Sequence, residues 1–343
     1  MEPVTHALTS LALARAGQRR VPRFGTAMLI VAGIAPDLDY LSYFGGAHAF
    51  IRFHRTALHS VAGSALMVCV LAGVFCALDR KYPRRAIAQG KSFPPLAFAG
   101  ALAVCAIGAA AHLLLDLASG TGVQLLWPFK AHWSEWDLVT NFDLWLLLLL
   151  AAGLLLPLLF KLVNEEVGEQ RKRTGQLAGL VTLALLAFYF GAKAKLHSQA
   201  IDLLLSREYH GRIPLSAGAF PEGSAPFDWR GVLVTDDTLE TIDVQVGLNQ
   251  PFDSNSSITH YKPQDSPALE LGQKNSATAQ FLDYARFPIA KVQHIEADYR
   301  FEVRDLRFED EDTEPANVLL RIDYDSSLKT RSEKFRFASS TEP

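Results

Sequence analysis

Long apolar runs dominate the first 200 residues and constrain what this part of the chain can fold into. A helix needs about 20 mostly apolar residues to cross a bilayer, because its backbone groups must all pair within the helix. Four runs have that length: 57–78, 93–117, 142–162 and 177–196. Two shorter runs, 4–14 and 24–36, come first and predict a tilted or partly embedded helical pair. We therefore expect a membrane all-α bundle of four long transmembrane helices plus this short pair.

The remainder of the chain has a different character. Residues 1–200 carry more Lys and Arg than Asp and Glu, whereas residues 201–343 carry more Asp and Glu. Segments 230–246, 292–308 and 317–337 alternate apolar and polar residues with the period of strands, and loops rich in Pro, Asn, Ser and Asp separate them. We predict two domains, a helical membrane domain at 1–200 and a small β-rich domain at 201–343.

The distribution of basic residues predicts the orientation of the helices. Basic loops stay cytoplasmic, and the basic residues gather in 15–23, 80–91 and 161–173. These loops alternate with connections that hold few basic residues, so the last helix exits outward. We expect a multi-pass protein of the bacterial inner (cytoplasmic) membrane whose C-terminal domain is extracytoplasmic.

Composition disfavours two classes of protein. The three cysteines lie in apolar runs and form no Cys-x-x-Cys motif, so neither a disulfide framework nor a cysteine metal site is expected. Nucleic-acid binding is disfavoured because membrane orientation already explains the basic residues and the tail is acidic. The partner implied is the lipid bilayer.

Ionisable side chains cluster at the helix ends predicted to be non-cytoplasmic. Such residues are costly in or beside membrane helices, so they are functional candidates. The set comprises His6, Asp37, Asp39, His54, Arg55, His59, His112, Asp116 and Asp143. Structural roles without a metal remain open for three of these residues: His6 as a surface residue, Asp116 as a polar helix end and Asp143 as an N-cap.

The spacing of these residues suits metal coordination. His112 and Asp116 are four residues apart, which places an imidazole and a carboxylate on one helical face. Asp37 and Asp39 follow Pro36 and point the same way if that segment is extended. Imidazole and carboxylate together favour zinc, manganese or iron, as one or two ions. Arg55 is a candidate clamp for an anionic substrate group.

The ordered set of motifs resembles the YdjM-type family, described as inner-membrane metal-dependent hydrolases. The motifs are Thr5-His6-Ala7, Pro36-Asp37-Leu38-Asp39, His54-Arg55-Thr56-Ala57-Leu58-His59-Ser60, His112-Leu113-Leu114-Leu115-Asp116 and the later Pro226-Phe227-Asp228-Trp229-Arg230. Thr56 departs from the pattern, in which Gly follows His-Arg. The resemblance implies that the metal ligands are His6, Asp37, Asp39, His54, His59, His112 and Asp116.

A more distant similarity suggests the reaction. The His-x-x-x-Asp element is similar to sites of zinc-dependent phospholipase C and nuclease P1, which implies phosphoester hydrolysis. The leading hypothesis is a membrane-bound metal-dependent hydrolase of phosphoester or lipid-linked, amphiphilic substrates at the outer face. Asp37, Asp39 and Arg55 are the catalytic candidates, with an aspartate as ligand or general base. The alternatives are a non-enzymatic scaffold or regulatory protein with a structural metal, and a transporter.

Overall fold

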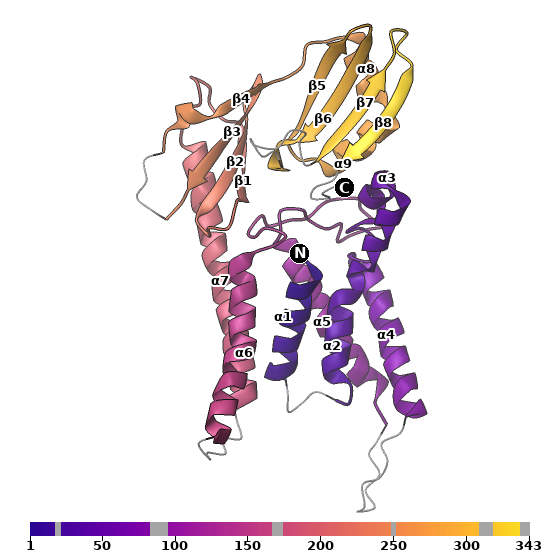
Figure 1. Ribbon diagram of the computed structural model, residues 1–343, viewed down its shortest axis with the longest axis vertical. Helices are drawn as coiled ribbons and strands as arrows, with labels where there is room; N and C mark the ends of the chain where they lie inside the picture. Colours follow the sequence, from indigo (N-terminus) through magenta and orange to yellow (C-terminus); the bar gives the residue numbers. More distant parts are fainter. Residues whose placement is uncertain (18–21, 83–94, 167–173, 248–251, 309–317, 337–343) are drawn as a thin grey trace, which may run out of the picture. The chain divides into compact units, whose positions relative to one another are not determined.

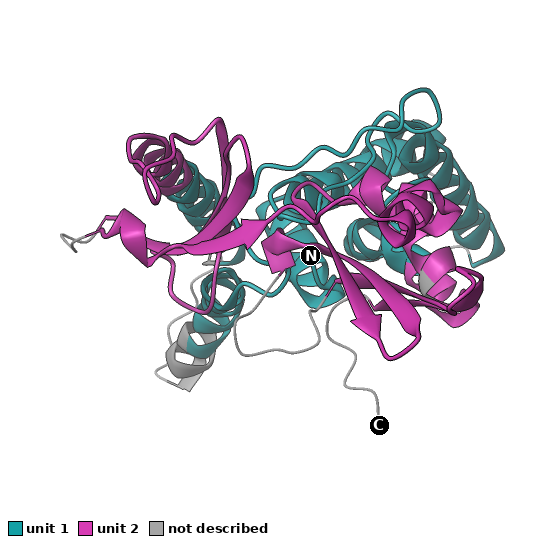
Figure 2. Ribbon diagram, turned by 90° about the horizontal axis from the view of Figure 1, so that it is seen from above, with its two compact units in different colours: residues 1–39, 55–194 teal, residues 40–54, 195–343 magenta. Residues whose placement is uncertain are grey.

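The computed structural model describes residues 1–17, 22–82, 95–166, 174–247, 252–308 and 318–336, and it divides into two compact units. Unit 1 comprises residues 1–39 and 55–194, and unit 2 comprises residues 40–54 and 195–343 (Figure 2). The chain therefore leaves unit 1 once for the short segment 40–54, before it leaves again at residue 195.

Unit 1 is a helical bundle in which α5 contacts α1, α2 and α4 (Figure 1). A 3-10 helix, η1 (Ala35–Gly45), continues α2 directly. The helices are α1 (Pro3–Ala16), α2 (Gly25–Ile34), α4 (Val61–Lys81), α5 (Phe98–Leu117), α6 (Leu144–Glu166) and the first part of α7 (Thr174–Leu205).

Small residues allow α2 and α5 to pack closely. A Cβ atom at Gly108 would lie 2.7 Å from the carbonyl oxygen of Leu29 and 3.2 Å from the backbone nitrogen of Gly33. A Cβ atom at Gly33 would in turn lie 2.1 Å from Ser10 Oγ of α1. Without side chains at these two positions the three backbones approach each other closely, as in other small-residue helix contacts.

Four helices among the described residues are long and apolar enough to cross a membrane: Gly25–Gly45, Val61–Lys81, Phe98–Leu117 and Gly175–Leu205. The number of membrane-length helices agrees with the prediction of four, but the segments that form them are not all the same. The short run 24–36 joins the set because η1 extends it to membrane length. The run 142–162 corresponds to α6, which is as long as predicted at Leu144–Glu166, and Leu144–Leu159 is its apolar part. Of the basic loop residues, those at 19–20, 84–91 and 171–173 lie outside the described residues, so the orientation stays a prediction.

Unit 2 contains two four-stranded antiparallel sheets in simple sequential order. A buried apolar cluster that includes Phe220, Val232 and Ile289 draws on both sheets. The first sheet holds β1 (Ser216–Pro221), β2 (Asp228–Val234), β3 (Thr238–Gln245) and β4 (Ile258–Tyr261). The second holds β5 (Pro288–Ile295), β6 (Asp298–Asp305), β7 (Leu319–Tyr324) and β8 (Thr330–Arg336).

Helices complete unit 2. Ser266 and Asn275 cap α8 (Pro267–Lys274) and α9 (Ser276–Tyr284), each accepting a hydrogen bond from a backbone N–H of the first turn. Both helices pack on the second sheet, and α3 (Ala47–Phe53) from the segment 40–54 contacts α9 and β8. The C-terminal region is thus rich in strands as predicted, but it also contains helices that the period-two pattern did not predict.

Candidate metal centre

Three helix ends of unit 1 supply the polar side chains of the site. His6 lies in the first turns of α1, and Asp37 lies at the start of η1 just beyond the end of α2. His112 and Asp116 lie one turn apart in the last turns of α5. Because these helices alternate in direction, residues distant in the sequence meet at one end of the bundle (Figure 1).

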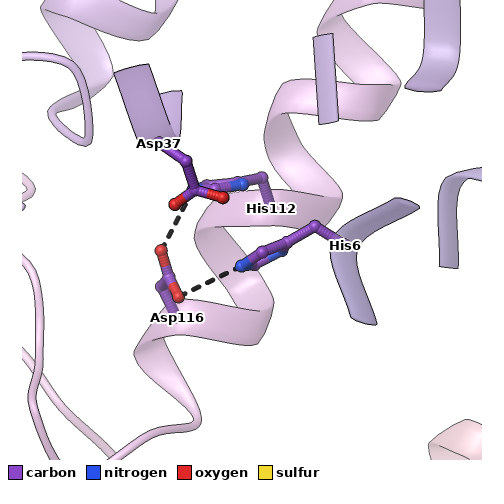
Figure 3. A group of neighbouring side chains, drawn as sticks. All are labelled: His6, Asp37, His112 and Asp116. Atoms are coloured by element: carbon purple, nitrogen blue, oxygen red, sulfur yellow. Dashed lines mark ion pairs between the residues drawn. The ribbon is translucent and has the colours of Figure 1, made fainter. Parts of the chain in front are cut away.

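The side chains of His6, Asp37, His112 and Asp116 converge on one point (Figure 3). One ligand atom from each lies within 4.8 Å of all the others, and all four residues are buried. Asp116 Oδ2 is 3.0 Å from His112 Nε2, and Asp116 Oδ1 is 3.4 Å from His6 Nε2. Nitrogen and carboxylate oxygen donors at this separation form a set suited to a divalent cation.

The imidazole of His59 lies against the same group. This residue precedes α4, whose N-cap Ser60 accepts a hydrogen bond from the backbone N–H of Gly63 at 2.9 Å. The Nε2 atom of His59 lies 3.0 Å from His112 Nε2, 3.1 Å from Asp116 Oδ2 and 3.8 Å from Asp37 Oδ1. His59 is therefore a fifth donor beside the four converging side chains.

Contacts at the far side of two rings determine which ring nitrogen faces the group. His112 Nδ1 lies 2.8 Å from the carbonyl oxygen of Gly33, which can only accept, so this nitrogen carries the proton. His59 Nδ1 lies 2.9 Å from Asp39 Oδ2. Both rings consequently present Nε2 to the centre, the arrangement by which outer partners orient metal-bound histidines.

Several buried polar atoms of the cluster lack a hydrogen bond. Within the described part of the chain, both ring nitrogens of His6 and the Oδ2 atoms of Asp37 and Asp116 make none. Leaving such atoms unsatisfied is costly, and the facing lone pairs of carboxylate and imidazole repel each other unless a positive charge lies between them. The residues present therefore fit a divalent cation.

The carboxylates of the cluster lie close to positively charged groups. Burial alone lowers the pKa of His59, but its close contacts with the carboxylates of Asp116, Asp37 and Asp39 outweigh it and raise the pKa to about 10. The α-amino group of Met1 and the guanidinium of Arg55 also approach Asp116, the latter at 3.4 Å. Carboxylates in this setting attract positive charge, which favours a cation over an anion at their centre.

Arg55 lies beside the cluster and is almost fully buried. It adopts a left-handed backbone conformation with φ of 58°. Its Nη1 donates to Ser119 Oγ at 3.0 Å and also to Thr121 Oγ1, and its backbone N–H donates to Asp39 Oδ2 at 2.7 Å. The guanidinium is thus held by the loop that follows α5. We did not single out Ser119 and Thr121 from the sequence, although both lie close after Asp116.

The structure places the seven residues implied by the resemblance in different settings. It brings together His6, Asp37, His112 and Asp116, with His59 in contact. Asp39 contacts His59 and Arg55, outside the group of four. His54 belongs to unit 2, where its ring packs 4.4 Å from that of Phe50 and 4.5 Å from that of Tyr40. Asp143, another candidate, accepts a hydrogen bond from the backbone N–H of Leu146 in α6, as an N-cap does.

The contact between Asp39 and His59 makes a testable prediction. We expect Asp39→Ala to lower the affinity for a divalent metal by about 10- to 100-fold, the usual effect of removing a partner that orients a ligand. Competition against a chelating dye measures this affinity. An unchanged affinity in a folded Asp39→Ala protein would show that His59 is oriented without Asp39, and the exposed His132→Ala variant provides the control.

Comparison with known proteins agrees with these features. Apolar helices of membrane length and a buried His/Asp group at their ends define a membrane-type helical protein with a candidate metal centre. The profile described as YdjM inner membrane protein matches residues 1–197, and the chain belongs to this family. No curated protein and no solved structure matches the chain. The resemblance found in the motifs is thereby confirmed.

Proposed function

We propose that the protein is a membrane-embedded, metal-dependent hydrolase. Its metal ligands are His6, Asp37, His112 and Asp116, with His59 as a further donor. One observation carries the proposal: four buried donor side chains converge within 4.8 Å, and several of their atoms lack a hydrogen bond. Unsatisfied buried polar atoms are rare in native structures, so their concentration at one point supports a bound ligand.

The donor set favours zinc, with manganese or iron as alternatives, over calcium or magnesium. One ion suits the group of four, and a second would need further donors such as Asp39. A divalent cation held here would acidify water and polarise a phosphoryl or carbonyl oxygen. The chain contributes the orientation of its imidazoles and the exclusion of bulk water.

Individual residues have distinct proposed roles. Asp37 Oδ2 lacks a hydrogen bond and is the atom we assign to accept a proton from the attacking water. Asp39 is a positioning residue, because its Oδ2 atom serves both His59 and the backbone of Arg55. Arg55 offsets the charge of Asp116 and supplies the cation that attracts a phosphate group.

The location of the site suggests the substrate class. His59 comes just before the membrane-length helix α4, and Asp116 is one residue from the end of α5. If these helices cross the bilayer, the donors lie near its surface. A phosphoester or lipid-linked substrate with an apolar portion is therefore the class we propose.

The test is a hydrolysis assay with the full chain in phospholipid vesicles. We expect zinc-loaded protein to hydrolyse bis(4-nitrophenyl) phosphate or a vesicle phospholipid, and His112→Ala to lose this activity. The exposed His132→Ala variant is the matched control and should retain it. If the protein binds zinc, manganese or iron but hydrolyses no substrate with any of them, the proposed hydrolase activity is contradicted.

Burial favours a second candidate, a scaffold or regulatory protein with a structural metal. His59 and Asp116 are 0% exposed, and catalytic sites usually keep a position open to water. In this case ligand substitutions would lower the melting temperature of the protein and would change no turnover. The same variants therefore distinguish the two functions.

We also propose that the C-terminal region lies outside the cytoplasm, in a protein of the bacterial inner membrane. The proposal rests on the basic loops, which favour the cytoplasmic side. Reporter fusions after Arg20, Arg85 and Lys172 should read inside, and a fusion after Glu342 should read outside. A reversed reading at any one position would contradict this topology.

A further inference from the structure

A ridge of exposed side chains projects from the loop between α5 and α6. We name Leu126–Lys130 the aromatic ridge. Leu126 is 54% exposed, Trp127 40% and Phe129 88%, and Lys130 is exposed at the end of the ridge. Consecutive large apolar side chains that remain exposed commonly mark a contact surface.

The backbone N–H groups of the aromatic ridge do not depend on water for their hydrogen bonds. Trp127 donates its N–H to the carbonyl of Gln124, and Phe129 and Lys130 both donate to the carbonyl of Leu126 at 2.9 and 3.0 Å. Pro128 has no N–H to satisfy. Each N–H from 127 to 130 is therefore paired or absent, which is a requirement for backbone that enters an apolar medium.

A hydrogen bond fixes the aromatic ridge at the end of a membrane-length helix. The backbone N–H of Val61, the first residue of α4, donates to the carbonyl of Leu125 at 2.9 Å. Further along α4, Leu66, Val70 and Val74 are spaced four residues apart and are 68%, 57% and 48% exposed. This apolar stripe on a helix long enough to cross a bilayer is a lipid-facing surface, and the ridge adjoins the end of that helix.

The same loop is tied to the candidate metal centre. The backbone N–H of Gln124 donates to the carbonyl of Arg55 at 3.0 Å, and Arg55 Nη1 contacts the carbonyl of Gly122. One residue, Leu125, separates Gln124 from the exposed part of the ridge. The ridge is therefore continuous with the stretch of loop that contacts Arg55.

We infer that the aromatic ridge inserts into the lipid leaflet at the end of the bundle that holds the metal cluster. Trp127 and Phe129 lie at the boundary between headgroups and acyl chains, where aromatic rings are favoured, and Lys130 reaches the lipid phosphates. The inference names the lipid surface that borders the proposed site. It rests on the proposed membrane embedding of α4, but not on hydrolysis.

Spin-label accessibility tests the inference with the full chain in vesicles of phosphatidylethanolamine and phosphatidylglycerol. Cys69, the exposed cysteine, is first replaced by alanine, while Cys76 and Cys105 are buried. Nitroxide labels are then attached to Phe129→Cys, to Val70→Cys as the lipid-facing control and to Tyr261→Cys, 69% exposed, as the aqueous control. Collisions with molecular oxygen and with a water-soluble nickel chelate are compared at each position.

We expect the label at position 129 to collide less often with the nickel chelate than the label at position 261 does. Its ratio of oxygen collisions to nickel collisions should lie between the ratios measured at positions 261 and 70. A label at 129 as accessible to nickel as the one at 261 would overturn the inference. Low accessibility to both reagents would overturn it as well, because another protein segment would then cover the ridge. If the label at position 70 is accessible to the nickel chelate, α4 does not face lipid there. This result would contradict the membrane embedding on which both the inference and the proposed function rest.

Discussion

His112→Ala will lower the affinity of the purified chain for zinc by more than about 100-fold, because even removal of a partner that orients a ligand costs about 10- to 100-fold. The imidazole of His112 faces Asp116 at 3.0 Å, stacks on the ring of His6 at 3.8 Å and lies 3.0 Å from His59. Its loss removes a donor and takes one of the imidazole nitrogens away from Asp37 and Asp116. Mass spectrometry of metal content and dye competition measure the effect.

The control for this substitution is another histidine of unit 1. His132 is exposed in the loop after α5, so His132→Ala should retain the wild-type metal content. Both variants are compared at equal folded fraction, judged by size-exclusion chromatography. Equal metal content in the two folded proteins would contradict the assignment of His112 and its neighbours as metal ligands. Loss of metal from His112→Ala alone would support it.

Gly108→Ala will destabilise the bundle by about 1–3 kcal/mol, the usual cost of overpacking a filled core. The added Cβ atom would lie 2.7 Å from the carbonyl oxygen of Leu29 and 3.2 Å from the Cβ of Ala32. The carbonyl is part of the helix backbone and cannot rotate away, so α2 and α5 must separate. Since Asp37 and His112 lie near the ends of these two segments, metal affinity should fall as well.

Gly73→Ala in α4 is the matched control for the packing effect. A Cβ atom at this position meets nothing within 4 Å. Alanine is more stable than glycine in a helix by about 0.5–1 kcal/mol, so this variant should be as stable as wild type or more stable. Unfolding in detergent, followed by fluorescence, compares both substitutions. Equal stability of the two variants would show that the α2 and α5 contact tolerates a side chain.

The hairpins of unit 2 show where sequence patterns were insufficient. We predicted 292–308 and 317–337 as strand segments, and each contains two strands joined by a turn. Glu296 and Leu328 occupy left-handed backbone conformations in these turns, with φ of 55° and 62°. Glycine or asparagine usually marks such positions, so the turn signal was absent from the sequence. The Ser266-Pro267 pair, in contrast, is a local helix-start signal for α8.

The sequence by itself determined the apolar helices, the family and the order of the polar motifs along the chain. These properties are local, because bilayer length and hydrophobic pattern are read within one segment. It also indicated that polar residues gather at one end of the helices, since antiparallel neighbours alternate their ends.

Only the tertiary structure decided how those polar residues are arranged. It directs the Nδ1 atom of His112 to Gly33, places Asp39 behind His59, and packs His54 between Phe50 and Tyr40 in unit 2. Each contact joins segments whose separation depends on how the helices pack. Close approaches between helices, such as the one at Gly108, set that packing. Spacing in the sequence specifies which residues share a helix face, but hydrogen-bond partners across helices follow from the packing distance alone.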